Sequence, residues 1–188
     1  MDIEINNVYL ENTGKLFRYY KKLGEQAIDQ LEEEQLFEAF NKNSNSIAVV
    51  IKHLWGNMLS RWTHFFTSDG EKEWRDRDAE FENDMKSREE LMFKWNEGWD
   101  CFFTAFNSIN PEDLLSIVYI RNEAHTVMEA LNRQLAHYAY HVGQIIFAAK
   151  LLKRKEWVSL SVPKNKSKEY NEKKFSIEKD LSDFTDDV

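Results

Sequence analysis

Cysteine, glycine and proline are scarce in this 188-residue sequence, which contains one, six and two of them, respectively. Because Cys101 is the only cysteine, an intramolecular disulfide is excluded, and a reducing cytoplasm is compatible with the chain. Tight turns depend on glycine and proline, so their scarcity argues against a many-stranded sheet. The composition favours helices.

Long apolar runs are also absent, since none approaches the ~20 residues that a helix needs to cross a bilayer. The first fourteen residues, MDIEINNVYLENTG, lack the basic and apolar regions of a signal peptide. We therefore expect a cytoplasmic protein without a membrane partner.

Positive charge is in deficit, with 25 Lys and Arg against 33 Asp and Glu and a formal net charge of −8. A surface that follows nucleic-acid phosphates needs clustered cations, so a nucleic-acid partner is not expected. Residues 177–188 hold five acids and one lysine, which is half of the net charge. Apolar residues make up 42% of the chain, enough for one packed core. We predict a single domain over residues 1–176 and a frayed acidic tail over 177–188.

Four long helices are predicted from apolar spacing and capping residues. They span Val8–Glu34; Ile47 to about Phe66, with Ser46 as N-cap; Glu89 to about Asn107, after a Ser87/Glu90 capping box; and a stretch to about Lys153, opened by a Thr126/Glu129 capping box. Four such helices in a chain of this size predict an all-α four-helix bundle. Its long connections fit a crossover topology.

Three connecting segments are less regular. Residues 68–83 are charged and rich in turn formers, and Trp74 and Phe81 suggest that this long loop packs on the bundle. Its ion pairs could pin it over one bundle end, or the loop could act as a substrate lid. Residues 114–125 are β-branched and predict a short hairpin or an irregular crossover, and the segment after residue 161 is expected to be extended.

The sequence HYAYHVGQ (137–144) carries two histidines four residues apart on the last predicted helix. At 100° per residue, Arg133, His137, His141 and Gln144 lie within about 40° of one line along that helix. Apolar residues flank this polar column on both sides, which predicts that it faces inward. Two imidazoles one turn apart can share a metal ion.

A third ligand must come from another helix. His53 and His64 on the second predicted helix are eleven residues apart, or about 16 Å along the axis, so both cannot reach one ion. His64 lies near the charged loop, and His125 is about 18 Å from His137 by helical rise. The best set is therefore His53, His137 and His141. The alternative is that these are hydrogen-bonded core histidines without a metal.

Three stretches of the chain resemble the DinB/YfiT-like superfamily of metalloenzymes, and within it a subgroup of uncharacterised bacterial proteins. They are SRWTHFFTSDGEKEWRDRDAEF (60–81), AHTVMEALNRQLAHYAYHVGQIIFAAK (124–150) and SVPKNKSKEYN (161–171). The resemblance covers most of the chain and excludes the acidic tail. It implies a four-helix bundle, commonly a homodimer, that holds a divalent metal ion through His53, His137 and His141. Some relatives transfer low-molecular-weight thiols, such as bacillithiol or mycothiol, onto electrophiles.

Three neutral imidazoles leave a coordination position open, as in catalytic zinc sites. They suit zinc, nickel, copper or iron, and zinc or nickel is our first expectation. Such a centre could activate a thiol for S-transfer or water for hydrolysis, or it could serve a non-catalytic metal-binding protein. Gln144 and Asn57 are expected to orient ligands. Arg133 is expected to pair with the acids of residues 71–84 or to receive an anionic substrate.

Overall fold

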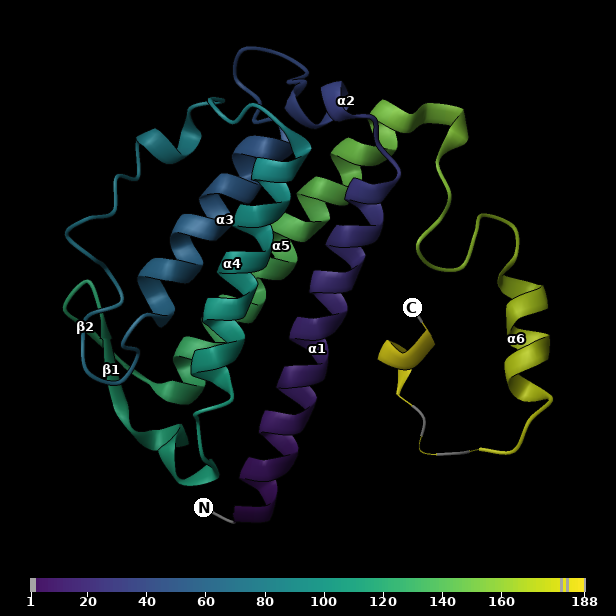
Figure 1. Ribbon diagram of the computed structural model, residues 1–188. Coiled ribbons are helices and arrows are strands. Elements are labelled where there is room, and N and C mark those ends of the chain that lie inside the picture. The colour runs from purple at the N-terminus through teal and green to yellow at the C-terminus, as the bar shows by residue number, and fades with distance from the viewer. Residues whose placement is uncertain (1–2, 180, 182, 188) are drawn as a thin grey trace.

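The computed structural model describes residues 3–179, 181 and 183–187. Four long helices form its body: α1 (Ile3–Asp29), α3 (Ile47–Trp62), α4 (Arg88–Phe106) and α5 (Val127–Lys153). Helices α1 and α5 run in one direction and α3 and α4 in the other (Figure 1). Helix α3 packs on α4 and on α5, and α1 packs on α5. The predicted all-α bundle is confirmed, and its crossover is the long connection between the parallel helices α3 and α4.

The helix starts follow the capping residues of the sequence. Ser46 Oγ accepts a hydrogen bond from Val49 N, and Ser87 Oγ accepts one from Glu90 N. Thr126 and Glu129 make both bonds of a capping box at the start of α5. The predicted box at Ser87 is only half formed, since Glu90 Oε2 accepts from Lys86 N instead of from Ser87 N. Three of the four long helices therefore begin where a side-chain oxygen satisfies free backbone donors.

Two helix ends differ from the prediction. Helix α1 ends at Asp29 rather than Glu34, and a separate short helix, α2 (Glu33–Phe37), begins where Glu32 N donates to Gln35 Oε1. Helix α3 ends at Trp62 rather than Phe66. The backbone of His64 has φ of 52°, a left-handed conformation that an α-helix cannot continue through.

The connection between α3 and α4 returns along the outside of the bundle and contains one short 3₁₀ helix, η1 (Ala79–Phe81) (Figure 1). After α4 come η2 (Pro111–Leu115) and the strands β1 (Ile117–Ile120) and β2 (Glu123–Thr126). The strands pair antiparallel, with Ile117 opposite Thr126. Of the two predictions for this region, the hairpin is the one that forms. Its two turn residues have φ of 57° and 61°, as a tight primed turn requires.

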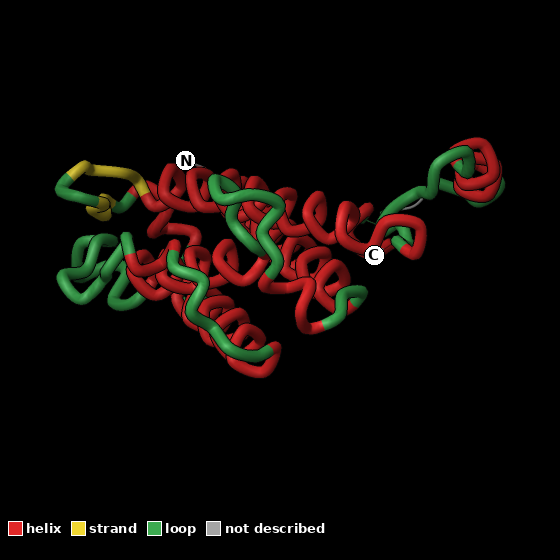
Figure 2. Tube along the Cα trace, turned by 90° about the horizontal axis from the view of Figure 1, so that it is seen from above, coloured by secondary structure: helices red, strands yellow, loops and turns green. Residues whose placement is uncertain are grey.

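The C-terminal segment contains η3 (Arg154–Glu156), α6 (Ser167–Phe175) and η4 (Phe184–Asp187). Helix α6 stands away from the four-helix body in both views (Figures 1 and 2). The prediction of an extended chain was wrong here, because Lys–Glu pairs three and four residues apart support a helix, with Lys166–Glu169 at 2.7 Å. The predicted acidic tail includes residues 180, 182 and 188, which lie outside the described residues. Over the described chain, no helix is both long and apolar enough to cross a membrane.

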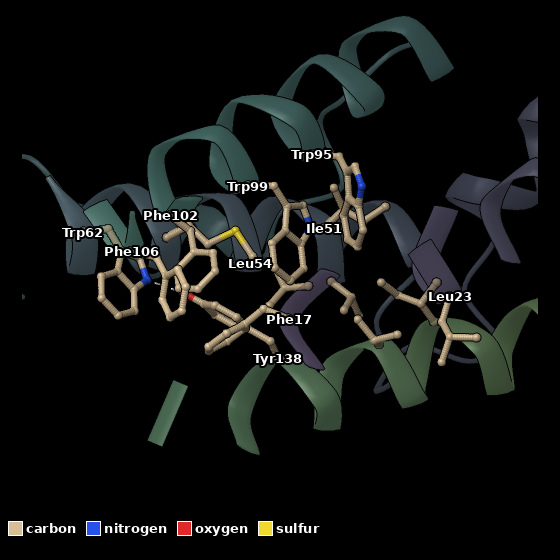
Figure 3. Close-up of a cluster of buried hydrophobic side chains, with 14 of the residues drawn as sticks. Phe17, Leu23, Ile51, Leu54, Trp62, Trp95, Trp99, Phe102, Phe106 and Tyr138 are labelled. Carbon is tan, nitrogen blue, oxygen red and sulfur yellow. Dashed lines mark hydrogen bonds between the residues drawn. The ribbon is translucent and has the colours of Figure 1, made fainter. Parts of the chain in front are cut away.

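Aromatic side chains from all four long helices fill the core (Figure 3). The Tyr138 ring of α5 lies 5.5 Å from Trp99 of α4 and 5.9 Å from Phe17 of α1. Its hydroxyl accepts a hydrogen bond from Trp62 Nε1 of α3 at 2.8 Å. Tyr138 is fully buried and follows His137 directly, so the packing of this ring sets how α5 is rotated on the bundle.

Replacing Tyr138 by Phe is expected to lower the free energy of unfolding by about 1–3 kcal/mol, because the buried Trp62 N–H loses its acceptor. Urea unfolding followed by circular dichroism measures the difference. Tyr140→Phe is the matched control, since Tyr140 is 61% exposed on the same helix and should change stability by less than about 0.5 kcal/mol. Equal stability of the wild type and Tyr138→Phe would show that the bond contributes nothing.

Candidate metal centre

The imidazoles of His53, His137 and His141 converge between α3 and α5. The Nε2 atom of His137 lies 3.3 Å from Nε2 of His53 and 3.0 Å from Nε2 of His141. One nitrogen from each ring falls within 4.8 Å of the others, and this is the only such group of metal-ligating side chains in the described part of the chain. The structure thus brings together the three histidines that the helical-rise argument selected.

The spacing of these nitrogens suits a small divalent ion. Zinc–nitrogen bonds are about 2.0–2.1 Å, and in a tetrahedral site two such ligand atoms are about 3.3 Å apart. The nitrogen pairs around His137 are already at 3.3 and 3.0 Å. Binding an ion would therefore require only small adjustments of the rings.

The protons of two histidines are fixed on the side away from the centre. His53 Nδ1 lies 2.9 Å from Glu80 Oε2, and His141 Nδ1 lies 2.8 Å from Gln144 Oε1. Carboxylate and amide oxygens accept hydrogen bonds, so each Nδ1 carries a proton, and in the neutral ring Nε2 presents a lone pair to the centre. His137 Nε2 can donate to one of these lone pairs at most. A divalent cation could accept a lone pair from all three nitrogens together.

Burial keeps the rings of His137 and His141 neutral. It lowers the pKa of His137 to about 3, with further depression from the neighbouring His141 and His53. Burial likewise lowers the pKa of His141 to about 4, against a smaller opposing effect of its hydrogen bond to Gln144. Metal ligation needs the neutral ring, so near neutral pH no proton competes for these two nitrogens.

Glu80, on η1, is a residue of the centre that the sequence did not reveal. Its carboxylate accepts a hydrogen bond from His53 Nδ1. It also accepts two from Arg75, with Nε–Oε1 at 2.6 Å and Nη2–Oε2 at 3.0 Å. Burial would raise the pKa of Glu80, but the hydrogen bonds from His53 and Arg75 outweigh it and hold the pKa below its usual value. A buried carboxylate that stays charged makes the Nδ1–H tautomer of His53 the favoured one.

The glycine at position 56 is the signal for Glu80 that the sequence did contain. It lies on α3, one turn beyond His53, and a Cβ added there would come within 2.8 Å of Glu80 Cδ. A glycine inside a helix costs up to about 1 kcal/mol, and at position 56 this cost accompanies the close approach of a neighbour to the backbone. Here that neighbour is the carboxylate that orients His53.

The long loop is held down mainly by ions rather than by its aromatic residues. Glu71 Oε2 lies 3.2 Å from nitrogens of both Arg61 and Arg121 and 3.8 Å from those of Arg75 and Arg77. The predicted pinning of the loop by ion pairs is confirmed. The predicted packing of the loop on the bundle is also confirmed, because η1 lies against α3, although Trp74 itself is 58% exposed. The Phe81 ring does pack, because it stacks on His53 with ring centroids 5.2 Å apart.

The remaining predicted residues differ in where they lie. Gln144 contacts His141, as described above, and Asn57 is buried one turn beyond His53. Arg133 is exposed and its Nη1 lies 3.0 Å from His125 Nε2. The predicted ion pair between Arg133 and the acids of 71–84 is not found among the described residues. Three of those acids, Glu71, Glu80 and Asp84, pair with other cations of the chain. His64 is exposed at the end of α3, away from the three histidines.

Comparison with known proteins adds one match. The model of a family described as "protein of unknown function (DUF1572)" matches residues 4–166, which include all three histidines, Glu80 and Gln144. No curated protein and no solved structure matches the chain.

Gly56→Ala is expected to lower the free energy of unfolding of the metal-free protein by about 1–3 kcal/mol. The new methyl group must displace the Glu80 carboxylate, which Arg75 and His53 hold in place. Urea unfolding in the presence of a chelator measures the change. Gly143→Ala is the matched control, because no atom lies within 4 Å of its added Cβ and the substitution should stabilise α5 by up to about 1 kcal/mol. Equal effects of the two substitutions would contradict the close approach of Glu80.

Proposed function

The chain belongs to the DUF1572 family, and we propose that it is a metalloprotein of the DinB/YfiT-like type that holds a divalent metal ion through His53, His137 and His141. The observation that carries the proposal is the convergence of three Nε2 atoms, two of which belong to rings whose Nδ1 proton points away from the centre. Zinc or nickel fits a set of three imidazoles.

The orientation of His137 supports the same proposal. Its ring is held so that Nε2 faces the Nε2 atoms of the other two histidines. His137 Nδ1, on the far side of the ring, is buried and has no hydrogen-bond partner among the described residues, so no hydrogen bond there sets the orientation.

The centre is suited to an activity because only three side chains contribute ligands. A bound metal with an open position supplies a Lewis acid that lowers the pKa of a thiol or of water. The protein's own contribution is to orient the rings, through Glu80 at His53 and Gln144 at His141. Phe81, stacked on His53, shields that ring from solvent. The resemblance to S-transferases leads us to propose that a small thiol is the ligand that is activated.

The metal proposal is tested by loading the purified protein with Zn²⁺ or Ni²⁺, removing free ions and measuring bound metal by elemental analysis. The wild type is expected to retain about one ion per chain, and His53→Ala, His137→Ala and His141→Ala are each expected to lose it. His64→Ala is the matched control, since that histidine is exposed and outside the cluster. Undiminished metal in His137→Ala would refute the proposal.

The thiol proposal is tested on the same metal-loaded protein with a small thiol and an aryl chloride electrophile. Metal-dependent loss of free thiol is expected for the wild type and is expected to fall to the uncatalysed rate in His137→Ala. Consumption of an electrophile without loss of thiol would assign hydrolysis instead. A fully loaded protein that consumes neither would favour a non-catalytic role for the metal.

A further inference from the structure

A row of polar side chains continues from the metal centre toward the hairpin end of the bundle. On α3 the row is His53, Asn57 and Arg61, spaced by four residues, and on α5 it includes His137 and Arg133 with the same spacing. The two helices are antiparallel neighbours, so Arg61 and Arg133 lie about two and one turns, respectively, from the histidines in the same direction (Figure 1). We call the part of this row beyond the histidines, with Arg75 and Gln134, the polar seam.

The polar seam has unmet hydrogen-bonding capacity. Of the eight buried side-chain nitrogen and oxygen atoms without a hydrogen-bond partner in the described chain, four belong to the seam and a fifth to His137. The seam atoms are Asn57 Oδ1, Arg61 Nε, Arg75 Nη1 and Gln134 Oε1. Buried polar atoms are seldom left unpaired, and four of them beside a ligand-binding centre point to a polar ligand rather than to packing.

The charge of this region is positive although the chain as a whole is acidic. A single carboxylate oxygen, Glu71 Oε2, lies within 4 Å of four guanidinium groups. Two of these guanidinium groups, Arg61 and Arg75, are buried. A divalent ion at the histidines would add to the same excess of positive charge. An anionic group on the ligand would offset that excess.

Arg133 is the guanidinium that can reach such a group. It is exposed, lies one turn before His137 and makes no ion pair with any described carboxylate. His125 Nδ1 lies 2.9 Å from Glu123 O, so that nitrogen carries the proton and Nε2 accepts from Arg133 Nη1. His125 of β2 thus positions Arg133 through a neutral imidazole nitrogen. The positive charge of the Arg133 guanidinium is therefore not paired with a carboxylate of the described chain.

We propose that the polar seam receives a carboxylate of the ligand bound at the metal centre, with Arg133 as its direct contact. The proposal rests on the proposed metal centre and names a substrate class for it: small molecules with a metal-binding group and a carboxylate a few bonds away. The planar fork of Arg133 matches a carboxylate, while Arg61 supplies positive potential from the buried side.

The test uses the Co²⁺-loaded protein and two thiols of the same length, mercaptopropionate and mercaptopropanol. Thiolate binding changes the visible spectrum of Co²⁺, so both affinities can be titrated without an activity assay. The wild type is expected to bind mercaptopropionate about 10-fold more tightly or better. Arg133→Gln is expected to abolish that preference while leaving Co²⁺ stoichiometry and mercaptopropanol affinity unchanged.

Arg77→Gln is the matched control, because it also removes one positive charge. That charge lies in the Glu71 cluster on the loop and not on α5. The variant should keep most of the preference. Failure of mercaptopropionate to bind more tightly than mercaptopropanol would overturn the carboxylate site alone. A preference that survives Arg133→Gln would do so too, since chelation by Co²⁺ would then explain it. A wild-type protein that takes up no Co²⁺ would overturn the metal centre as well.

Discussion

The contact between Glu80 and His53 is the interaction on which the centre depends. It joins a residue of the long loop to a residue of α3 and fixes the proton of His53 on the side away from the other histidines. Arg75 completes this contact by pairing with the Glu80 carboxylate. Burying that carboxylate without a cationic partner would cost several kcal/mol. The hydrogen bonds of Glu80 therefore both hold this part of the loop against α3 and orient His53.

The packing of the bundle core fixes the distance between α3 and α5, which the loop alone does not. Tyr138 and Trp62 are buried beside the polar row, and their hydrogen bond crosses between the helices that carry the histidines. Because close-packed aromatic rings leave little room for a helix to rotate, the imidazoles of α5 face His53 at a set spacing. The polar groups therefore lie in a frame that apolar packing determines.

The features that depend on helical periodicity and capping could be predicted from the sequence. The helix starts at Ser46, Ser87 and Thr126, the bundle, and the grouping of His53 with His137 and His141 all follow from capping and helical rise. Glu80, Arg75 and the pairing of Arg133 with His125 could not be predicted in this way. They lie on a loop or a hairpin, where no repeat fixes which side chain meets which, and only the structure shows that the loop turns back onto α3.

The histidines that meet at the centre come from segments far apart in the chain. His53 and His137 are separated by 84 residues, so their contact closes a loop that includes α4, the long connection and the hairpin. Such non-local contacts form late in folding, because the entropy of loop closure must be met first. A newly made chain therefore has no centre to load until its last long helix has docked. From then on, an ion bound there would act as a reversible cross-link between the two halves of the chain and would slow their separation.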